Sequence, residues 1–192
     1  MMKRVLWISL WIHSILMMVT TTSLSQIDDN TILYYSFDKS DGKKVIDGVG
    51  KHDGELGGDA KITKGRGGRF GEGLQVDGDG DYVRAGNIGA PEEGTVECWI
   101  KLVEYKKHND GDGIAGMGKE YGNTGDIMLF GVHQKFNLNL QFGMYAGGWK
   151  WADSGVDIND FIGEWRHVAG TWGKRGLEVW IDGEKKGEKS VK

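Results

Sequence analysis

The stretch "GEWRHVAGTWGKRGLEVWIDGEKKGE" (residues 163–188) combines a histidine with three tryptophans and several carboxylates. Apolar and polar residues alternate over 165–172 and again over 177–181, which is the period of a half-buried β-strand. The "GKRG" between them predicts a tight connection. Asp182-Gly183 predicts a type I′ turn into a last short strand, because both central residues of that turn need positive φ. We therefore expect a hairpin, with these packing side chains: Trp165, Val168, Leu177, Val179 and Ile181.

Similar alternating runs recur along the chain, separated by glycine- and aspartate-rich stretches. They are "TILYYSFD" (31–38), "GLQVDGDGDYVRAG" (73–86), "GTVECWIKLV" (94–103), "DIMLFGVH" (126–133) and "FNLNLQFGMY" (136–145). The first has apolar residues on both faces, which predicts a strand covered on both sides. Only "INDFIGEW" (158–165) has some helical character. With 33 glycines and one proline, the pattern predicts an all-β protein, an antiparallel β-sandwich or jelly roll.

The N-terminus has the features of a secretory signal peptide. Lys3 and Arg4 precede the 15-residue apolar run 5–19, and Ser23 and Ser25 are spaced for cleavage before Gln26. A membrane-spanning helix needs ~20 apolar residues. We therefore expect residues 1–25 to form a helical signal peptide that is removed, with no stable membrane insertion afterwards. Residues 26–192 would then form a single secreted or surface-displayed domain.

Charge and cysteine content restrict the function further. Without Lys3 and Arg4, 22 of the 24 basic residues remain against 28 acidic ones, a net charge of −6. This balance argues against nucleic acid as a partner, because phosphate binding needs concentrated positive charge. The single cysteine, Cys98, cannot form an internal disulfide, and its place in "TVECWI" indicates a small buried hydrophobic residue rather than a reactive thiol.

The order of these motifs resembles the LamG-like jelly-roll domain of the concanavalin A-like lectin/glucanase superfamily. The resemblance rests on "LYYSFDKSDGKKVIDGVGKHDGEL", "GLQVDGDGDYVRAG", "GTVECWIKL" and "GEWRHVAGTWGKRGLEVWIDGE", in the order of the family. It implies a concanavalin A-like sandwich over residues 26–192. Family members close with one or two further strands that carry an acidic residue. We expect this chain to lack that segment by truncation, or else to close its sandwich in another way.

Catalysis is not expected. Glucanase relatives carry Glu-x-Asp-x-x-Glu or a close variant on one strand, where residues two apart share a face. Glu97 has no acidic neighbour two positions away, and no Gly-x-Ser-x-Gly or His-Glu-x-x-His motif is present. His167 most resembles a catalytic group, but neither an orienting acid nor a nucleophile lies near it in the sequence. We interpret it as a structural histidine.

The resemblance implies a structural calcium ion in the loop after the first strand. The matching loop carries Asp47 and Asp53, whose oxygens suit a hard cation. Two further acidic stretches, "DGDGDYV" (77–83) and "HNDGDG" (108–113), lack the glycine at position six or the glutamate at position twelve of an EF-hand loop. We interpret both stretches as tight turns.

Glycan binding is the third possibility. Sugars stack on exposed aromatic rings, while amides and carboxylates recognise their hydroxyls. "YAGGWKWADSG" (145–155) places Tyr145, Trp149 and Trp151 around a Gly-Gly turn, with Asp153 close behind. On a strand the two tryptophans share one face, which is either a binding surface or the core. Asn137, Asn139 and Gln141 form a neighbouring polar stripe.

We therefore predict a non-catalytic binding or adhesion module whose partner is an extracellular carbohydrate or protein. A degenerate or incomplete glycoside hydrolase of the same superfamily is one alternative. A structural domain of a larger surface protein, without a ligand site of its own, is the other.

Overall fold

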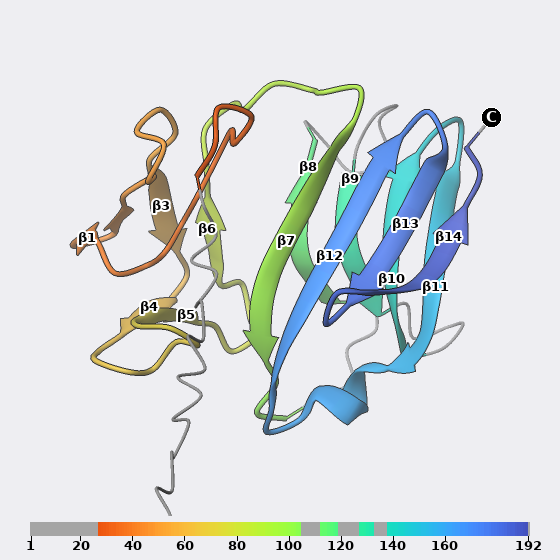
Figure 1. Cartoon of the computed structure of the whole chain (residues 1–192). Coiled ribbons are helices and arrows are strands. Elements are labelled where there is room, and N and C mark those ends of the chain that lie inside the picture. The colour runs from red at the N-terminus through yellow and green to blue at the C-terminus, as the bar shows by residue number, and fades with distance from the viewer. Residues whose placement is uncertain (1–26, 105–111, 119–126, 133–137, 192) are drawn as a thin grey trace, which may run out of the picture.

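The computed structural model describes residues 27–104, 112–118, 127–132 and 138–191. Within these ranges the chain forms fourteen β-strands and one short 3₁₀ helix, so the predicted all-β class is confirmed (Figure 1). The predicted signal peptide, residues 1–25, lies outside the described residues. Among the helices in the described ranges, none is long and apolar enough to cross a membrane.

Two four-stranded antiparallel sheets form a sandwich (Figure 1). The first sheet has the order β14-β13-β12-β7 and the second has the order β11-β10-β9-β8. The strands of the first sheet are β7 (Gly94–Lys101), β12 (Trp165–Gly173), β13 (Gly176–Ile181) and β14 (Glu184–Lys189). Those of the second are β8 (Asp112–Met117), β9 (Ile127–Val132), β10 (Asn139–Tyr145) and β11 (Trp149–Asp157).

The predicted hairpin is confirmed as β12 and β13, with Gly173 opposite Gly176 across the "GKRG" turn. Asp182 and Gly183 have φ values of 51° and 80°, as a type I′ turn requires, and lead into β14. The Asp182 carboxylate also accepts a hydrogen bond from the backbone N–H of His167 at 2.9 Å. This aspartate therefore ties the turn back to β12 in addition to forming it.

The core lies between the two sheets. Its buried residues are Leu140, Phe142, Ala152, Ile158, Phe161, Val168, Trp172, Leu177, Val179 and Ile181. Four of the five predicted hairpin packing residues are among them. Trp165 is not, because it is an odd number of positions from Val168 on the same strand and therefore points to the other face. Gly170 allows close packing, since a Cβ there would lie 2.3 Å from the Phe142 ring.

The two sheets approach each other closely where β14 meets β11. Gly187 of β14 packs directly against the backbone of Asp153 in β11, and a Cβ on Gly187 would lie 2.0 Å from the Asp153 carbonyl oxygen. Only glycine, which lacks a side chain, permits this contact.

The N-terminal region, residues 27–84, forms two smaller sheets beside the sandwich (Figure 1). One sheet has the order β1-β2-β3-β6, and the other is the hairpin β4-β5. Their strands are β1 (Ser40–Asp41), β2 (Lys44–Val45), β3 (Gly54–Gly57), β4 (Lys61–Thr63), β5 (Gly73–Gln75) and β6 (Tyr82–Arg84).

The strand predicted over 31–38 is wrong. This segment forms no ladder, although its apolar residues are mostly half-buried. The backbone of Tyr34 instead forms hydrogen bonds with the loop at residues 47–48. Its N–H donates to Asp47 Oδ1, and its carbonyl accepts from the Gly48 N–H. Phe37 has φ 65°, which breaks an extended backbone. The segment with helical character contains the 3₁₀ helix η1 (Ile158–Phe161).

Candidate functional site

The predicted aromatic residues of β11 lie on the face of the sheet that points away from the core. Ala152 and Ser154 are buried, whereas Trp149, Trp151 and Asp153, at the alternate positions, are half-buried. Successive side chains of a strand point to opposite faces. The structure therefore places both tryptophans on the outer face of the β8–β11 sheet rather than in the core.

The rings on this face contact one another. Trp149 and Trp151 are stacked, with centroids 4.9 Å apart and an interplanar angle of 19°. Tyr145 meets Trp149 edge to face at 5.8 Å. Trp151 lies across the neighbouring strand, where a Cβ on Gly143 would be 2.3 Å from its ring. Gly143 in β10 therefore makes room for the Trp151 ring.

Asp153 gathers polar groups next to these rings. Its Oδ1 accepts a hydrogen bond from Asn139 Nδ2 at 2.9 Å and its Oδ2 accepts one from Gln141 Nε2, also at 2.9 Å. The backbone N–H of Gly155 donates to Oδ1 at 2.8 Å. The carboxylate thereby orients two amide side chains. We call these residues together the aromatic–amide face: Asn139, Gln141, Tyr145, Trp149, Trp151 and Asp153.

All four predicted ligand-binding residues thus belong to one surface. Of the polar stripe described from sequence, Asn139 and Gln141 lie on this face, where Gln141 is only 6% exposed, and Asn137 lies outside the described residues. Amides whose orientation is held by a carboxylate, beside aromatic rings, are the groups that recognise sugar hydroxyls and sugar C–H faces.

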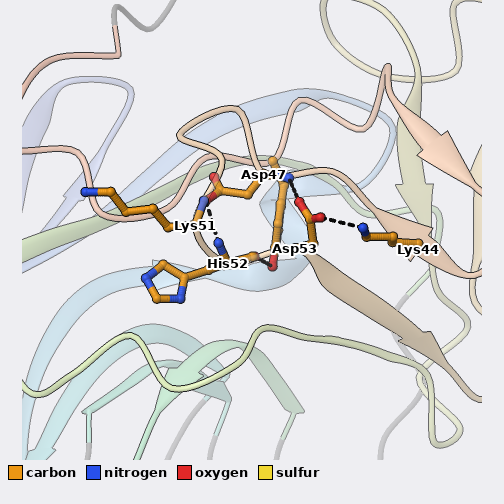
Figure 2. A network of polar contacts seen from close by, with 6 residues as sticks. Lys44, Asp47, Lys51, His52 and Asp53 are labelled. Atoms are coloured by element: carbon orange, nitrogen blue, oxygen red, sulfur yellow. Dashed lines mark hydrogen bonds and ion pairs between the residues drawn. The ribbon is translucent and has the colours of Figure 1, made fainter.

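Asp47 organises the loop after the first segment (Figure 2). Its side chain is only 2% exposed. Oδ1 accepts from the backbone N–H groups of Tyr34 and Val49, and Oδ2 accepts from those of Lys51 and His52, at 2.9–3.1 Å. Burial acts to raise the pKa of Asp47, but the four N–H donors outweigh it and hold this pKa below its usual value.

Asp53 lies beside Asp47 and completes the network (Figure 2). Its Oδ1 accepts a hydrogen bond from the Asp47 N–H at 2.9 Å, and its Oδ2 pairs with Lys44 Nζ at 2.7 Å. Lys44 is the main cause of the lowered pKa of Asp53. The Tyr35 hydroxyl donates to the His52 carbonyl at 2.6 Å. Burial and the charges of Asp47 and Asp53 raise the pKa of Tyr35 to about 12.

The two predicted calcium ligands are therefore brought together, but their donor set does not fit a cation in this arrangement. A carboxylate has about four lone-pair positions, and four N–H groups already point at those of Asp47. Asp53 faces a further N–H and the ammonium group of Lys44. These N–H and ammonium groups occupy the carboxylate lone pairs that a Ca²⁺ ion would need for coordination at 2.3–2.6 Å.

Residues 77–81 of the acidic stretch form a turn, as the sequence indicated, and residues 82–83 begin β6. Gly78 and Gly80 have φ values of 84° and 78°. Carboxylate oxygens of Asp59, Asp77 and Asp81 lie within 4.8 Å of one another. Asp81 accepts hydrogen bonds from the backbone N–H groups of Asp59 and Asp77, at 2.7 and 3.1 Å. Its oxygens therefore hold the turn closed. Most of 108–113 lies outside the described residues.

Cys98 and His167 lie on opposite faces of the β7–β12 sheet. Cys98 packs against the core, and burial raises the pKa of its thiol to about 12, so the thiol stays protonated at neutral pH. His167 points outward, and its Nε2 lies 3.4 Å from Glu97 Oε2. Its acid partner comes from the neighbouring strand, where the local sequence around His167 could not show it. Identifying the residues of β7 and β12 that point away from the core would have found the pair.

The comparisons with known proteins agree with this fold. A family model described as the concanavalin A-like lectin/glucanases superfamily matches residues 77–192. That match spans more than half of the chain, and the protein belongs to this superfamily as a LamG-like jelly-roll domain. Comparisons with curated proteins and with solved structures return no match.

Proposed function

We propose that this domain is a non-catalytic carbohydrate-binding module and that the aromatic–amide face is its binding surface. The observation that carries the proposal is the outward placement of Trp149 and Trp151 beside the Asp153 carboxylate. Aromatic rings on the outer side of a sheet contribute little to the core between the sheets. Next to amides held in fixed directions, they form a surface suited to sugar rings.

The charge of this face favours a neutral glycan. Asp153 is the acidic group at its centre, and it is held by Asn139, Gln141 and the Gly155 N–H. A carboxylate in that position repels an anionic substituent. We therefore infer that unsubstituted hexose or pentose polymers bind here. An extracellular location fits both the predicted signal peptide and such a ligand.

A glycan array followed by calorimetry tests the proposal. We expect the parent domain to retain at least one neutral oligosaccharide, and Trp151→Ala to weaken its affinity about tenfold or more, since one aromatic contact contributes ~1–2 kcal/mol. Asp153→Asn leaves the shape nearly unchanged and removes the charge, and should also weaken binding. The control is Val103→Ala, which changes an exposed side chain just after β7, a strand of the other sheet.

Two results would contradict the proposal. Retention of no glycan by the folded parent domain would favour a structural role. Release of reducing sugar from β-glucans by the purified domain would favour the glycoside hydrolase alternative.

A further inference from the structure

A second outward-facing aromatic cluster lies on the opposite side of the sandwich. Val96, Cys98 and Ile100 of β7 pack against the core, so Trp99 points outward at the alternate position. The loop between β4 and β5 brings Phe70 against it, with ring centroids 5.6 Å apart at 88°. Both rings are accessible, since Phe70 is 62% exposed and Trp99 is 38% exposed.

Arg69 sits in the corner that these two rings form. Its guanidinium carbon is 5.0 Å from the Phe70 centroid and 5.0 Å from the Trp99 centroid. The side chain is exposed, and no carboxylate within the described ranges forms an ion pair with it. Two aromatic contacts therefore restrain the guanidinium while its N–H donors stay available.

The nearest acidic residue on the outward face of β7 is already engaged. Glu97 lies two positions from Trp99 and contacts His167 Nε2 at 3.4 Å. His167 in turn meets the Trp99 ring at 5.4 Å. The hydrogen bond from His167 is the main cause of the lowered pKa of Glu97. Lys101, two positions beyond Trp99, is exposed and adds a second positive charge to this outward face.

We propose that Arg69, Phe70 and Trp99 form a binding site for an acidic saccharide, a pyranose unit that carries a carboxylate. A guanidinium restrained by contacts with two rings can present the paired N–H groups that match a carboxylate bidentately. The exposed Phe70 ring offers an apolar surface to the C–H face of the same sugar. A fixed cation beside an accessible ring thus supplies both contacts that a uronic acid residue needs.

This site is separate from the aromatic–amide face, which lies on the outer side of the other sheet and has a carboxylate at its centre. The two surfaces differ in charge and therefore in the ligands they select. A chain with both would bind neutral and acidic glycans on opposite sides of one domain.

Calorimetry with uronate oligosaccharides in the presence of a chelator tests the inference. The probes are hexamers of galacturonate, glucuronate and mannuronate, each compared with its methyl ester, which has the same rings without the charge. We expect at least one acid hexamer to bind and its ester to bind at least about tenfold more weakly, since hydrogen bonds to charged groups are worth ~1.5–3 kcal/mol.

Variants in the same loop distinguish this site from general charge attraction. We expect Arg69→Gln to weaken binding of the acid hexamer about tenfold or more, and Phe70→Ala to weaken it at constant charge. Arg66→Gln removes the same charge from an exposed position nearby and is the matched control. Equal losses for Arg66→Gln and Arg69→Gln would overturn the proposal, and so would equal affinity for acid and ester.

Failure here and failure of the proposed function remain distinguishable. Trp151→Ala should leave uronate binding unchanged, and Arg69→Gln should leave neutral glycan binding unchanged. If Trp151→Ala abolishes the binding of both ligands while the domain stays folded, the second site does not exist. Binding of sulfated but not of carboxylated hexamers would also overturn the assignment of the ligand.

Discussion

The sandwich and the N-terminal region fill their interiors with different groups. Between the sheets of the sandwich, ten buried side chains form one continuous apolar cluster that includes Phe142, Phe161 and Trp172. In the N-terminal region the buried side chains include Val45 and Leu56, together with the carboxylate of Asp47. Its strands have two to four residues, against six to nine in the sandwich.

This difference shows two ways of closing a β-structure. Long strands bury enough apolar surface to hold a sandwich through packing alone. Short strands cannot do this, and the N-terminal region instead gathers four backbone N–H groups around one charged side chain. The N-terminal region is therefore organised around the hydrogen bonds of Asp47, whereas the sandwich relies on apolar packing.

The largest effect should come from the sandwich. Phe142→Ala removes a fully buried ring that packs against Gly170 and Trp172, and should lower the free energy of unfolding by about 3–5 kcal/mol. Denaturant unfolding measures it. Phe142→Leu, which keeps most of the volume, is the control and should cost clearly less. Equal losses for both variants would mean that the ring is not tightly packed.

Asp47→Ala should have the next largest effect, a loss of about 2–3 kcal/mol, because it leaves four partly buried N–H groups without their acceptor. Hydrogen exchange should show the loss concentrated at residues 34 and 49–52, with the sandwich amides still protected. Asp41→Ala, at an exposed position of β1, is the control. If protection falls uniformly over the whole chain, the two regions unfold as one unit and the contrast drawn above is wrong.

Acid should act on the N-terminal region before the sandwich. The pKa of Asp47 in the folded state lies below its unfolded value of 3.8, so its stabilisation is complete above that value. It is lost as the pH falls from about 4 through the folded pKa. Asp53 shifts in the same direction. Hydrogen exchange between pH 5 and pH 2.5 should show residues 34 and 49–52 opening first, and Asp47→Asn should reduce that pH dependence to the part that Asp53 contributes.

The smallest effect should come from the charged edge of the sandwich. Lys185 contacts Glu188 at 2.7 Å and Glu178 at 3.5 Å, and the side chains of Lys185 and Glu188 are exposed. Lys185→Ala should leave the melting temperature essentially unchanged, because exposed ion pairs contribute little. A clear drop in melting temperature at low salt that disappears at high salt would show that these surface pairs do hold β14.

Alternation along single strands was sufficient to predict the sandwich. The run 94–103 and the hairpin at 165–181 formed as expected, because each strand carries its own apolar face. The run 31–38 shows the same alternation and forms no strand. The backbone of Tyr34 bonds to the Asp47 loop instead, and a contact between Tyr34 and a carboxylate 13 residues away leaves no periodic signal in the sequence.

The candidate site could be predicted in part. The pattern correctly placed Trp149 and Trp151 on one face, but a strand with apolar residues on both faces does not indicate which face is the core. Ala152 and Gly143 decide it, through packing with the other sheet and across the strand pair. The cluster around Arg69 escaped prediction because Phe70 and Trp99 come from a loop and a strand that only the tertiary fold brings together.

The glycine at 187 has a consequence for anyone who wishes to alter specificity. Its backbone touches the carbonyl of Asp153, whose side chain orients the amides of the proposed sugar site. A library that varies Asn139, Gln141 and Trp149 can change what is recognised without disturbing this contact. Substituting Gly187 would instead push β11 outward and misalign the recognition groups, although position 187 belongs to the opposite sheet. Retargeting the domain therefore means treating Gly187 as an invariant part of the sugar site.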